Sequence, residues 1–164
     1  MSNKEYQFLF GGIIPATQEA YNGGVFSPTV RKHEKACVVA FKKIVSDYLS
    51  NHRPSPLFPT ANQVYVGIIQ FYTSYKNNYN KRDVDNMAKT MLDTLKENNF
   101  YSDDSQVRTL LVSKIVDRKR VQQDIGFVYI KILNDGEDIK FAEDIILRAV
   151  EMYGDIKVGE VNIS

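Results

Sequence analysis

The sequence predicts an α+β domain with some α/β character, in which helices pack on a mixed β-sheet. Segments with the alternating or continuous apolar residues typical of strands are interleaved with segments whose apolar residues recur every three or four positions, as in amphipathic helices. The 164 residues, 43% of them hydrophobic and 25% charged, have the size and composition of one globular domain. The predicted order is strand, helix, strand, helix, strand, strand, helix.

Four segments have the pattern of strands. In the first, Tyr6, Phe8 and Phe10 alternate with other residues, as the pleat of a strand requires. The second is a nearly continuous apolar run, and the last two are joined by a charged connection. These strands are predicted at residues 5–14, 63–73, 106–116 and 125–133.

Two helices are predicted between the strands. The first is expected to begin at Ser27 as N-cap, with Pro28 in its first turn, and to place Cys37 and Phe41 on its apolar face. The second is expected to stop near residues 98–99. Its apolar face is made of Met87, Ala88, Met91, Leu92 and Leu95.

A last helix follows the short linker at residues 134–138. Its apolar stripe is wide enough that it has to be buried against another surface. We expect it to lie on the sheet of its own subunit because the linker is short; the alternative is a contact with a second subunit. The stripe comprises Ile139, Ala142, Ile146, Ala149 and Val150, widened by Phe141, Ile145 and Met152.

The composition excludes several classes of protein. One cysteine excludes an internal disulfide, and one cysteine with two histidines cannot make a structural zinc site. No apolar run is long enough to cross a bilayer, and the N-terminus lacks the apolar region of a signal peptide, so we expect a cytoplasmic protein without a membrane partner. The net charge of +1 gives no support to a dedicated nucleic-acid binder.

Two pairs of aspartates flank the second predicted helix. If residues 83–85 are extended, Asp83 and Asp85 leave the chain on one side and Val84 on the other, and Asp85 can cap the helix. Asp103 and Asp104 follow the helix, whose far end lies ~20 Å from its start. The second pair reaches the first only if the loop and the next strand run back along the helix.

Two interpretations of these carboxylates stay open. Several carboxylates at one point remain ionised together only beside a positive charge. A hard cation such as Mg²⁺, which takes oxygen ligands, would supply that charge, and two such ions can promote phosphodiester cleavage. Alternatively, the first pair is an ordinary helix cap and the second an ordinary turn. Lys89, a cation near the start of a helix against the helix dipole, adds weight to a functional site.

The acidic segment resembles the RusA family of Holliday junction resolvases. The family signature is Asp-x-Asp-Asn, a lysine three residues later, a helix with Leu-Asp-x-Leu, and Asp-Asp-x-Gln-Val at the start of a strand. The matching residues are Asp83, Asp85, Asn86, Lys89, Leu92, Asp93, Leu95, Asp103, Asp104, Gln106 and Val107. The likeness covers roughly residues 6–133, which implies a nuclease domain at 1–133 and a C-terminal helical extension at 134–164, packed on the same domain.

The resemblance implies a chemistry. It implies a Mg²⁺-dependent endonuclease, with Mn²⁺ as a substitute metal, that acts as a homodimer on four-way DNA junctions in recombination and repair. Asp83, Asp85, Lys89 and Asp104 would be catalytic, and the three aspartates would bind the metal, with Asp103 as a further candidate. The alternatives are a nuclease for flap or branched DNA and a non-cleaving DNA-binding dimer of the same fold.

Basic and aromatic residues near the acidic segment are candidates for DNA contacts. Tyrosines could stack on bases, and lysines and arginines could meet phosphates, although packing and a solvated turn explain the same residues. The candidates are Lys76, Tyr79, Lys81, Arg82, Lys114, Arg118, Lys119 and Arg120, with Tyr72 and Tyr75 in the same loop.

Overall fold

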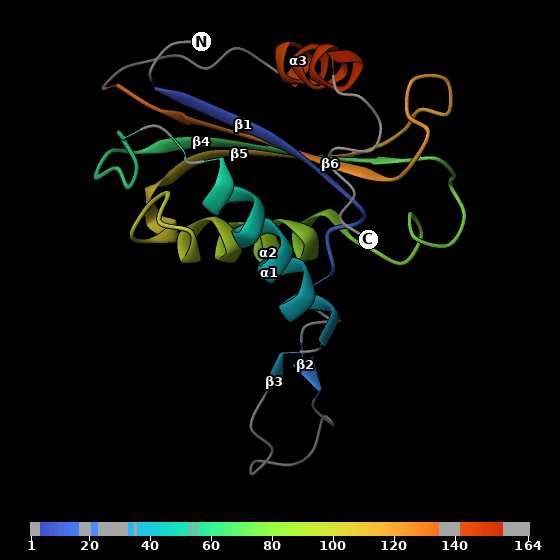
Figure 1. Cartoon of the computed structure of the whole chain (residues 1–164), viewed down its shortest axis with the longest axis horizontal. Coiled ribbons are helices and arrows are strands. Elements are labelled where there is room, and N and C mark those ends of the chain that lie inside the picture. The colour runs from blue at the N-terminus through green and yellow to red at the C-terminus, as the bar shows by residue number, and fades with distance from the viewer. Residues whose placement is uncertain are drawn as a thin grey trace.

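The computed structural model describes residues 4–16, 21–22, 33–34, 36–52, 54, 56–134 and 142–155. A four-stranded sheet lies between two layers of helices (Figure 1). The strands are β1 (Glu5–Gly11), β4 (Val64–Tyr72), β5 (Val107–Val116) and β6 (Ile125–Ile132), and the helices are α1 (Ala36–Asn51), α2 (Val84–Glu97) and α3 (Ala142–Asp155). The α+β class and the predicted order of the main elements are confirmed.

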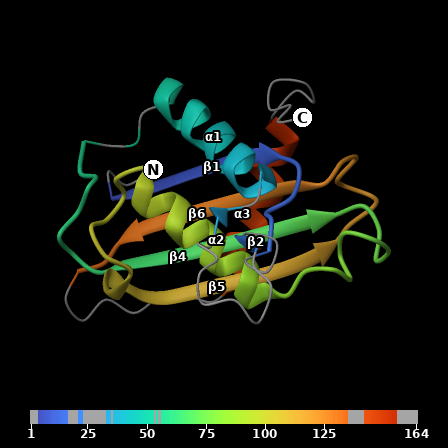
Figure 2. The same cartoon turned by 90° about the horizontal axis from the view of Figure 1, so that it is seen from below.

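The sheet is mixed, in the order β1-β6-β4-β5. β6 pairs antiparallel with both β1 and β4, whereas β4 and β5 are parallel. Parallel neighbours need a crossover connection, and α2 supplies it between β4 and β5. β5 forms one edge of the sheet, and α2 crosses the face of the sheet obliquely on the way back (Figure 2).

Each face of the sheet has its own hydrophobic core. The face toward α1 and α2 is filled by Phe8, Phe10 and Ile68 of the sheet, against Phe41 and Met91 of the helices. Because successive residues of a strand point to opposite faces, the neighbouring positions of the same strands form the second core. All nine residues of β4 are buried, which explains its nearly continuous apolar sequence.

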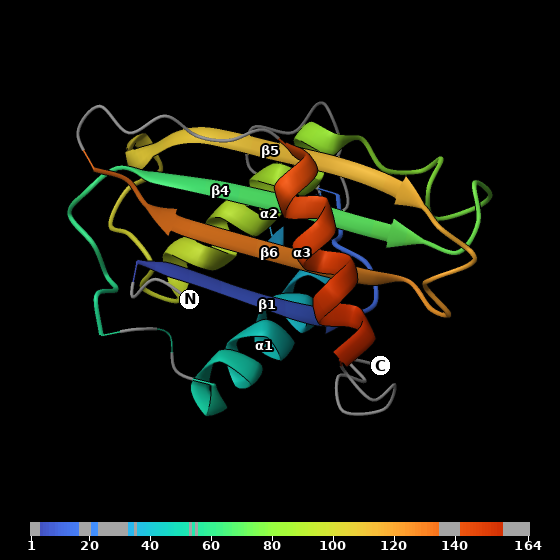
Figure 3. The same cartoon turned by 90° about the horizontal axis from the view of Figure 1, so that it is seen from above.

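α3 crosses the opposite face (Figure 3). Ile145 and Ala149 are buried there, and a Cβ added to Gly67 of β4 would lie 3.1 Å from the Ile145 side chain. Arg148 joins α3 to β1 through an ion pair with Glu5, with Nη1 and Oε2 2.7 Å apart. The helix thus packs on the sheet of its own chain. Residues 135–141, including the predicted stripe members Ile139 and Phe141, lie outside the described residues, as does the side chain of Ile146.

The first helix differs from its prediction. The expected cap, Ser27 with Pro28, lies outside the described residues. Residues 33–34 are not helical but form β3 (His33–Glu34), which pairs antiparallel with β2 (Tyr21–Asn22). Pairing with residues 21–22 outweighs the local helix propensity there, because tertiary contacts routinely override propensity, and α1 starts only at Ala36. Its buried positions are Val38, Phe41, Val45 and Leu49, so the apolar face is rotated from the expected one and Cys37 is exposed.

Candidate functional site

The first acidic pair lies at the start of α2. The N-cap is Asp83, in an extended conformation (φ −93°, ψ 148°), and not Asp85 as predicted. The carbonyl oxygen of Asp83 accepts the bond from the Met87 amide at 3.1 Å, so Val84 is already helical. Val84 is 42% exposed and does not point inward as predicted. Both carboxylates nevertheless stand at the mouth of the helix.

Asp83 is an unusual N-cap. An aspartate in this position normally accepts a hydrogen bond from an amide two or three residues later. The Asp83 side chain makes no such capping bond, and the side chain is exposed. Its carboxylate therefore remains directed to solvent at a helix N-terminus, where the helix dipole favours negative charge.

A row of alternating charge runs along α2 from this point. Asp85, Lys89 and Asp93 are four residues apart, which places them on one side of the helix. Burial, and then the negative charge of Asp104, raise the pKa of the Asp93 carboxyl, against the opposing effects of Lys42 and Lys89. Asp93 had been recognised only as part of the signature. Its spacing of four residues from Lys89 is the signal that could have identified it as a member of the charged row.

The second acidic pair divides into two roles. Asp103 caps the 3-10 helix η2 (Asp104–Gln106): its Oδ1 accepts from the Ser105 amide at 2.8 Å, and Gln106 Oε1 accepts in return from the Asp103 amide at 3.1 Å. The Ser105 hydrogen bonds hold the pKa of Asp103 below its ordinary value. This is a capping box, so one of the two carboxylates is engaged by the fold. Asp104 is exposed beside it.

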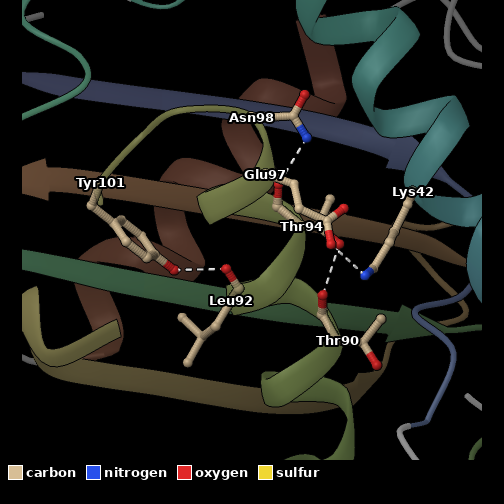
Figure 4. Close-up of polar contacts among 7 residues, drawn as sticks. All are labelled: Lys42, Thr90, Leu92, Thr94, Glu97, Asn98 and Tyr101. Carbon is tan, nitrogen blue, oxygen red and sulfur yellow. Dashed lines mark hydrogen bonds and ion pairs between the residues drawn. The ribbon is translucent and has the colours of Figure 1, made fainter. Parts of the chain in front are cut away.

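The turn that carries Asp104 is fastened to the C-terminal half of α2. The Tyr101 hydroxyl donates to the Leu92 carbonyl at 2.9 Å (Figure 4), and Lys96 Nζ lies 4.0 Å from Asp103 Oδ2. Burial, followed by the charges of Asp104 and Asp93, raises the pKa of the Tyr101 hydroxyl. The charge of Asp104 therefore acts on the middle of α2, at Asp93.

The two acidic pairs lie toward opposite ends of α2. The 14 residues of the helix extend ~20 Å, and β5 begins directly after η2, without the returning loop that would bring the pairs together. Across the described ranges, no three histidine, cysteine, aspartate or glutamate side chains stand close enough to hold a metal ion. The exposed carboxylates nevertheless match the chemistry of Mg²⁺. This ion commonly binds one or two carboxylates and completes its coordination shell with water and phosphate oxygens.

The predicted DNA contacts divide into buttressing and exposed residues. Three of the basic candidates bond to neighbouring parts of the chain. Arg82 Nη1 donates to the Asn78 carbonyl at 3.3 Å, and Arg120 Nε donates to the Asp117 carboxylate at 2.6 Å. Lys114 donates to two backbone carbonyls. Tyr79 stacks edge-on against both Tyr72 and Tyr75. The exposed basic candidates are Lys76, Lys81, Arg118 and Lys119, together with Arg120, which is exposed although it pairs with Asp117.

A surface hollow lies beside this aromatic group. It has a volume of about 580 Å³ and is lined by Tyr75 and residues 116–120. Tyr75 is 59% exposed, and Arg118 and Lys119 belong to the same wall. The hollow therefore combines an accessible aromatic ring with three exposed cations, of which Arg120 is paired with Asp117.

Comparisons with known proteins identify the family. In the described part of the chain, none of the helices is both long and apolar enough to cross a membrane. A search of curated proteins found no match. The family model described as endodeoxyribonuclease RusA matches residues 16–131, which is more than half of the chain and includes α2 with both acidic pairs. The chain is thus a member of the RusA family of endodeoxyribonucleases.

Proposed function

We propose that this protein is a Mg²⁺-dependent endonuclease, with Mn²⁺ as a substitute metal, that resolves four-way DNA junctions in the cytoplasm during recombination and repair. Membership of the RusA family supports DNA as the substrate. The observation that carries the proposal is the exposed charge at the start of α2. It consists of the Asp83 carboxylate, which makes no capping bond, and of Asp85 and Lys89 in the first turns of the helix.

The proposed roles follow from the chemistry of these groups. Asp83, Asp85 and Asp104 would hold the metal, and Asp103 is disfavoured as a ligand because Ser105 already occupies its carboxylate. A bound Mg²⁺ would supply Lewis acidity and lower the pKa of a bound water. Lys89, one turn after Asp85, would place its ammonium group against the scissile phosphate and offset the charge that develops there.

A homodimer fits both the substrate and the geometry. A four-way junction has two symmetric strands to cut, and a two-fold dimer presents two identical sites. The separation of the acidic pairs gives a further reason. A two-fold axis that set two α2 helices antiparallel would bring the start of each helix toward the Asp104 end of the other. A complete carboxylate site would then form only between two subunits.

Mixing two inactive variants tests this arrangement. Asp85→Asn and Asp104→Asn chains, each without cleavage activity alone, are expected to recover junction nicking when they are unfolded and refolded together, because half of the composite sites in a mixed dimer are intact. Separately refolded chains that are combined without subunit exchange are the control. Failure to recover activity in a mixture shown by sedimentation to contain mixed dimers would place each site within one subunit.

Contacts with the DNA strands are proposed around the loop before α2. Lys76, Lys81, Arg118 and Lys119 are exposed and would neutralise phosphates. The hollow beside Tyr75 could take an unstacked base, since base–aromatic stacking contributes ~1–3 kcal/mol per base. A concentrated patch of this kind accounts for DNA binding by a chain whose net charge is only +1.

Cleavage assays on three substrates test the proposed function. A labelled four-way junction, a flap and a plain duplex are incubated with the protein, with and without Mg²⁺. The proposal expects symmetrical cuts in the junction that require the metal. Preferential cleavage of the flap would identify a less selective nuclease for branched DNA. Junction binding without cleavage under any divalent metal would identify a non-cleaving member of the fold.

A further inference from the structure

The loop that leads into Asp83 is held at both ends by side chains from elsewhere in the fold. At its start, Asp124 Oδ1 accepts from the Thr73 amide at 2.9 Å and from the Thr73 hydroxyl at 3.2 Å. At its end, Lys114 of β5 donates from Nζ to the carbonyl oxygens of Tyr79 and Arg82, each at 2.7 Å. The ten residues between β4 and Asp83 are therefore fixed without being part of a helix or strand.

The hydrogen bond from Lys114 to the Arg82 carbonyl acts directly on the backbone of Asp83. The Arg82 carbonyl belongs to the peptide bond whose nitrogen is that of Asp83, so Lys114 fixes the plane of that peptide. Hydrogen bonds from a charged donor are stronger than those between neutral groups. The Lys114 ammonium also lies 3.9 Å from the centre of the Tyr79 ring, which adds a cation–π contact and leaves Nζ surrounded by the loop on two sides.

The position of Lys114 distinguishes it from the other basic residues on this side of the molecule. It is aligned with Gln70 of β4 in the parallel ladder and is only partly exposed, whereas Arg118 and Lys119 are exposed in the connection between β5 and β6. Two of its three N–H groups already have carbonyl partners. The geometry is that of an internal support and not of a phosphate contact.

We propose that Lys114 is a positioning residue for the metal centre: it holds the peptide that delivers Asp83 and so fixes where this carboxylate stands. The inference rests on the proposed function because it takes Asp83 as a metal ligand. Residues that orient ligands from outside the coordination shell typically contribute ~10–100-fold to metal affinity or activity. Lys114 would act through the backbone of its ligand.

The test compares Lys114→Met with a matched change elsewhere. Lys43→Met removes a lysine that is exposed on α1, where it pairs with Asp47, and has the same effect on net charge. In a Mn²⁺ titration without DNA, Lys114→Met is expected to raise the half-saturating concentration ~10–100-fold and Lys43→Met to leave it unchanged. Lys114→Arg, which keeps the charge and several donors, should lie nearer to wild type.

Two further measurements separate positioning from DNA contact. Amide hydrogen exchange at residues 79–87 should become faster in Lys114→Met and stay unchanged in Lys43→Met. Junction binding in the absence of divalent metal should be the same in both variants. Unchanged exchange and unchanged Mn²⁺ affinity, together with weaker junction binding in Lys114→Met alone, would overturn the proposal and assign Lys114 to the DNA.

The remaining outcomes also decide the question. If Lys114→Met does not fold, Lys114→Gln keeps a neutral donor and is expected to raise the Mn²⁺ requirement in the same direction by a smaller factor; an unchanged requirement there would overturn the proposal. A wild-type chain that binds Mn²⁺ but cuts no branched DNA would remove the proposed substrate and leave the positioning role intact. A wild-type chain that binds no Mn²⁺ would remove both.

Discussion

The two ends of α2 carry similar acidic sequences but treat their aspartates in opposite ways. At the start, the capping residue Asp83 makes no side-chain capping bond, and its backbone is held in place by Lys114 from another element. At the far end, Asp103 caps its own turn through Ser105 and Gln106. The first end keeps its carboxylates available, whereas the second engages one and leaves only Asp104 exposed.

This difference shows how a fold can release a polar group for function. An aspartate at a helix start usually stabilises the helix through its side chain, and a carboxylate used in that way is a poorer ligand. Lys114 orients the peptide before Asp83 through the Arg82 carbonyl, so this orientation does not use the Asp83 carboxylate. Variants along α2 and in the turn after it test this contrast.

Asp85→Asn should abolish cleavage, because it replaces a proposed carboxylate ligand by a neutral amide of the same size. Folding should be unaffected, and junction binding should be retained or become tighter because a negative charge facing phosphates is lost. A junction cleavage assay with a binding assay checks both effects. Asp47→Asn, an exposed change on α1, is the control. Near-normal cleavage by Asp85→Asn would refute the assignment of Asp85 as a ligand.

Lys89→Ala should slow cleavage ~10²–10³-fold if its ammonium group stabilises the transition state. Thermal stability should change little, since Lys89 is exposed and surface charges contribute weakly. Single-turnover rates at saturating protein separate this effect from weaker binding, and Lys43→Ala provides the comparison. Rates equal to those of wild type would reduce Lys89 to an ordinary surface residue.

Asp103→Ala should leave cleavage nearly intact and lower the melting temperature slightly, because it removes a cap and not a ligand. The pKa of Asp103 is depressed in the folded protein. Its contribution to stability is therefore present above the ordinary carboxyl pKa and is lost as the pH falls through the lower folded value. Melting temperatures of the variant and wild type should converge at acid pH. Loss of cleavage in a folded Asp103→Ala chain would instead return this residue to the metal site.

Asp93→Asn should give the smallest effect, with the opposite dependence on pH. The folded-state pKa of Asp93 is raised above 3.8, first by burial. Stability from this group is thus fully present below the ordinary pKa and is lost as the pH rises through the higher folded value. Urea unfolding of the variant across that window should show a flatter pH profile than wild type. Parallel profiles would contradict the burial of this carboxyl.

The sequence predicts the main elements of this fold well and the contacts between them poorly. The apolar run of β4 and the apolar face of α2 are local patterns, and both elements formed where expected. The β2–β3 pair was missed because two-residue strands leave no periodic signal. Asp83 rather than Asp85 became the cap because the helix start depends on how the loop is held, and Lys114 holds it from 32 residues away. The sequence does not show whether a lysine is half-buried or exposed.

The place of β6 in the sheet constrains how the protein can fold during its synthesis. β6 lies between β1 and β4. β4 can pair earlier with β5, but β1 has no partner in this sheet until residues 125–132 have been made. Translation at ~5–20 residues per second needs several seconds to cover the 60 residues from the end of β4 at 72 to the end of β6 at 132. Throughout that interval β1 has no ladder to join. A ribosome-bound chain therefore carries the acidic segment of α2 before the four-stranded sheet is complete, and β1 joins only when β6 is inserted.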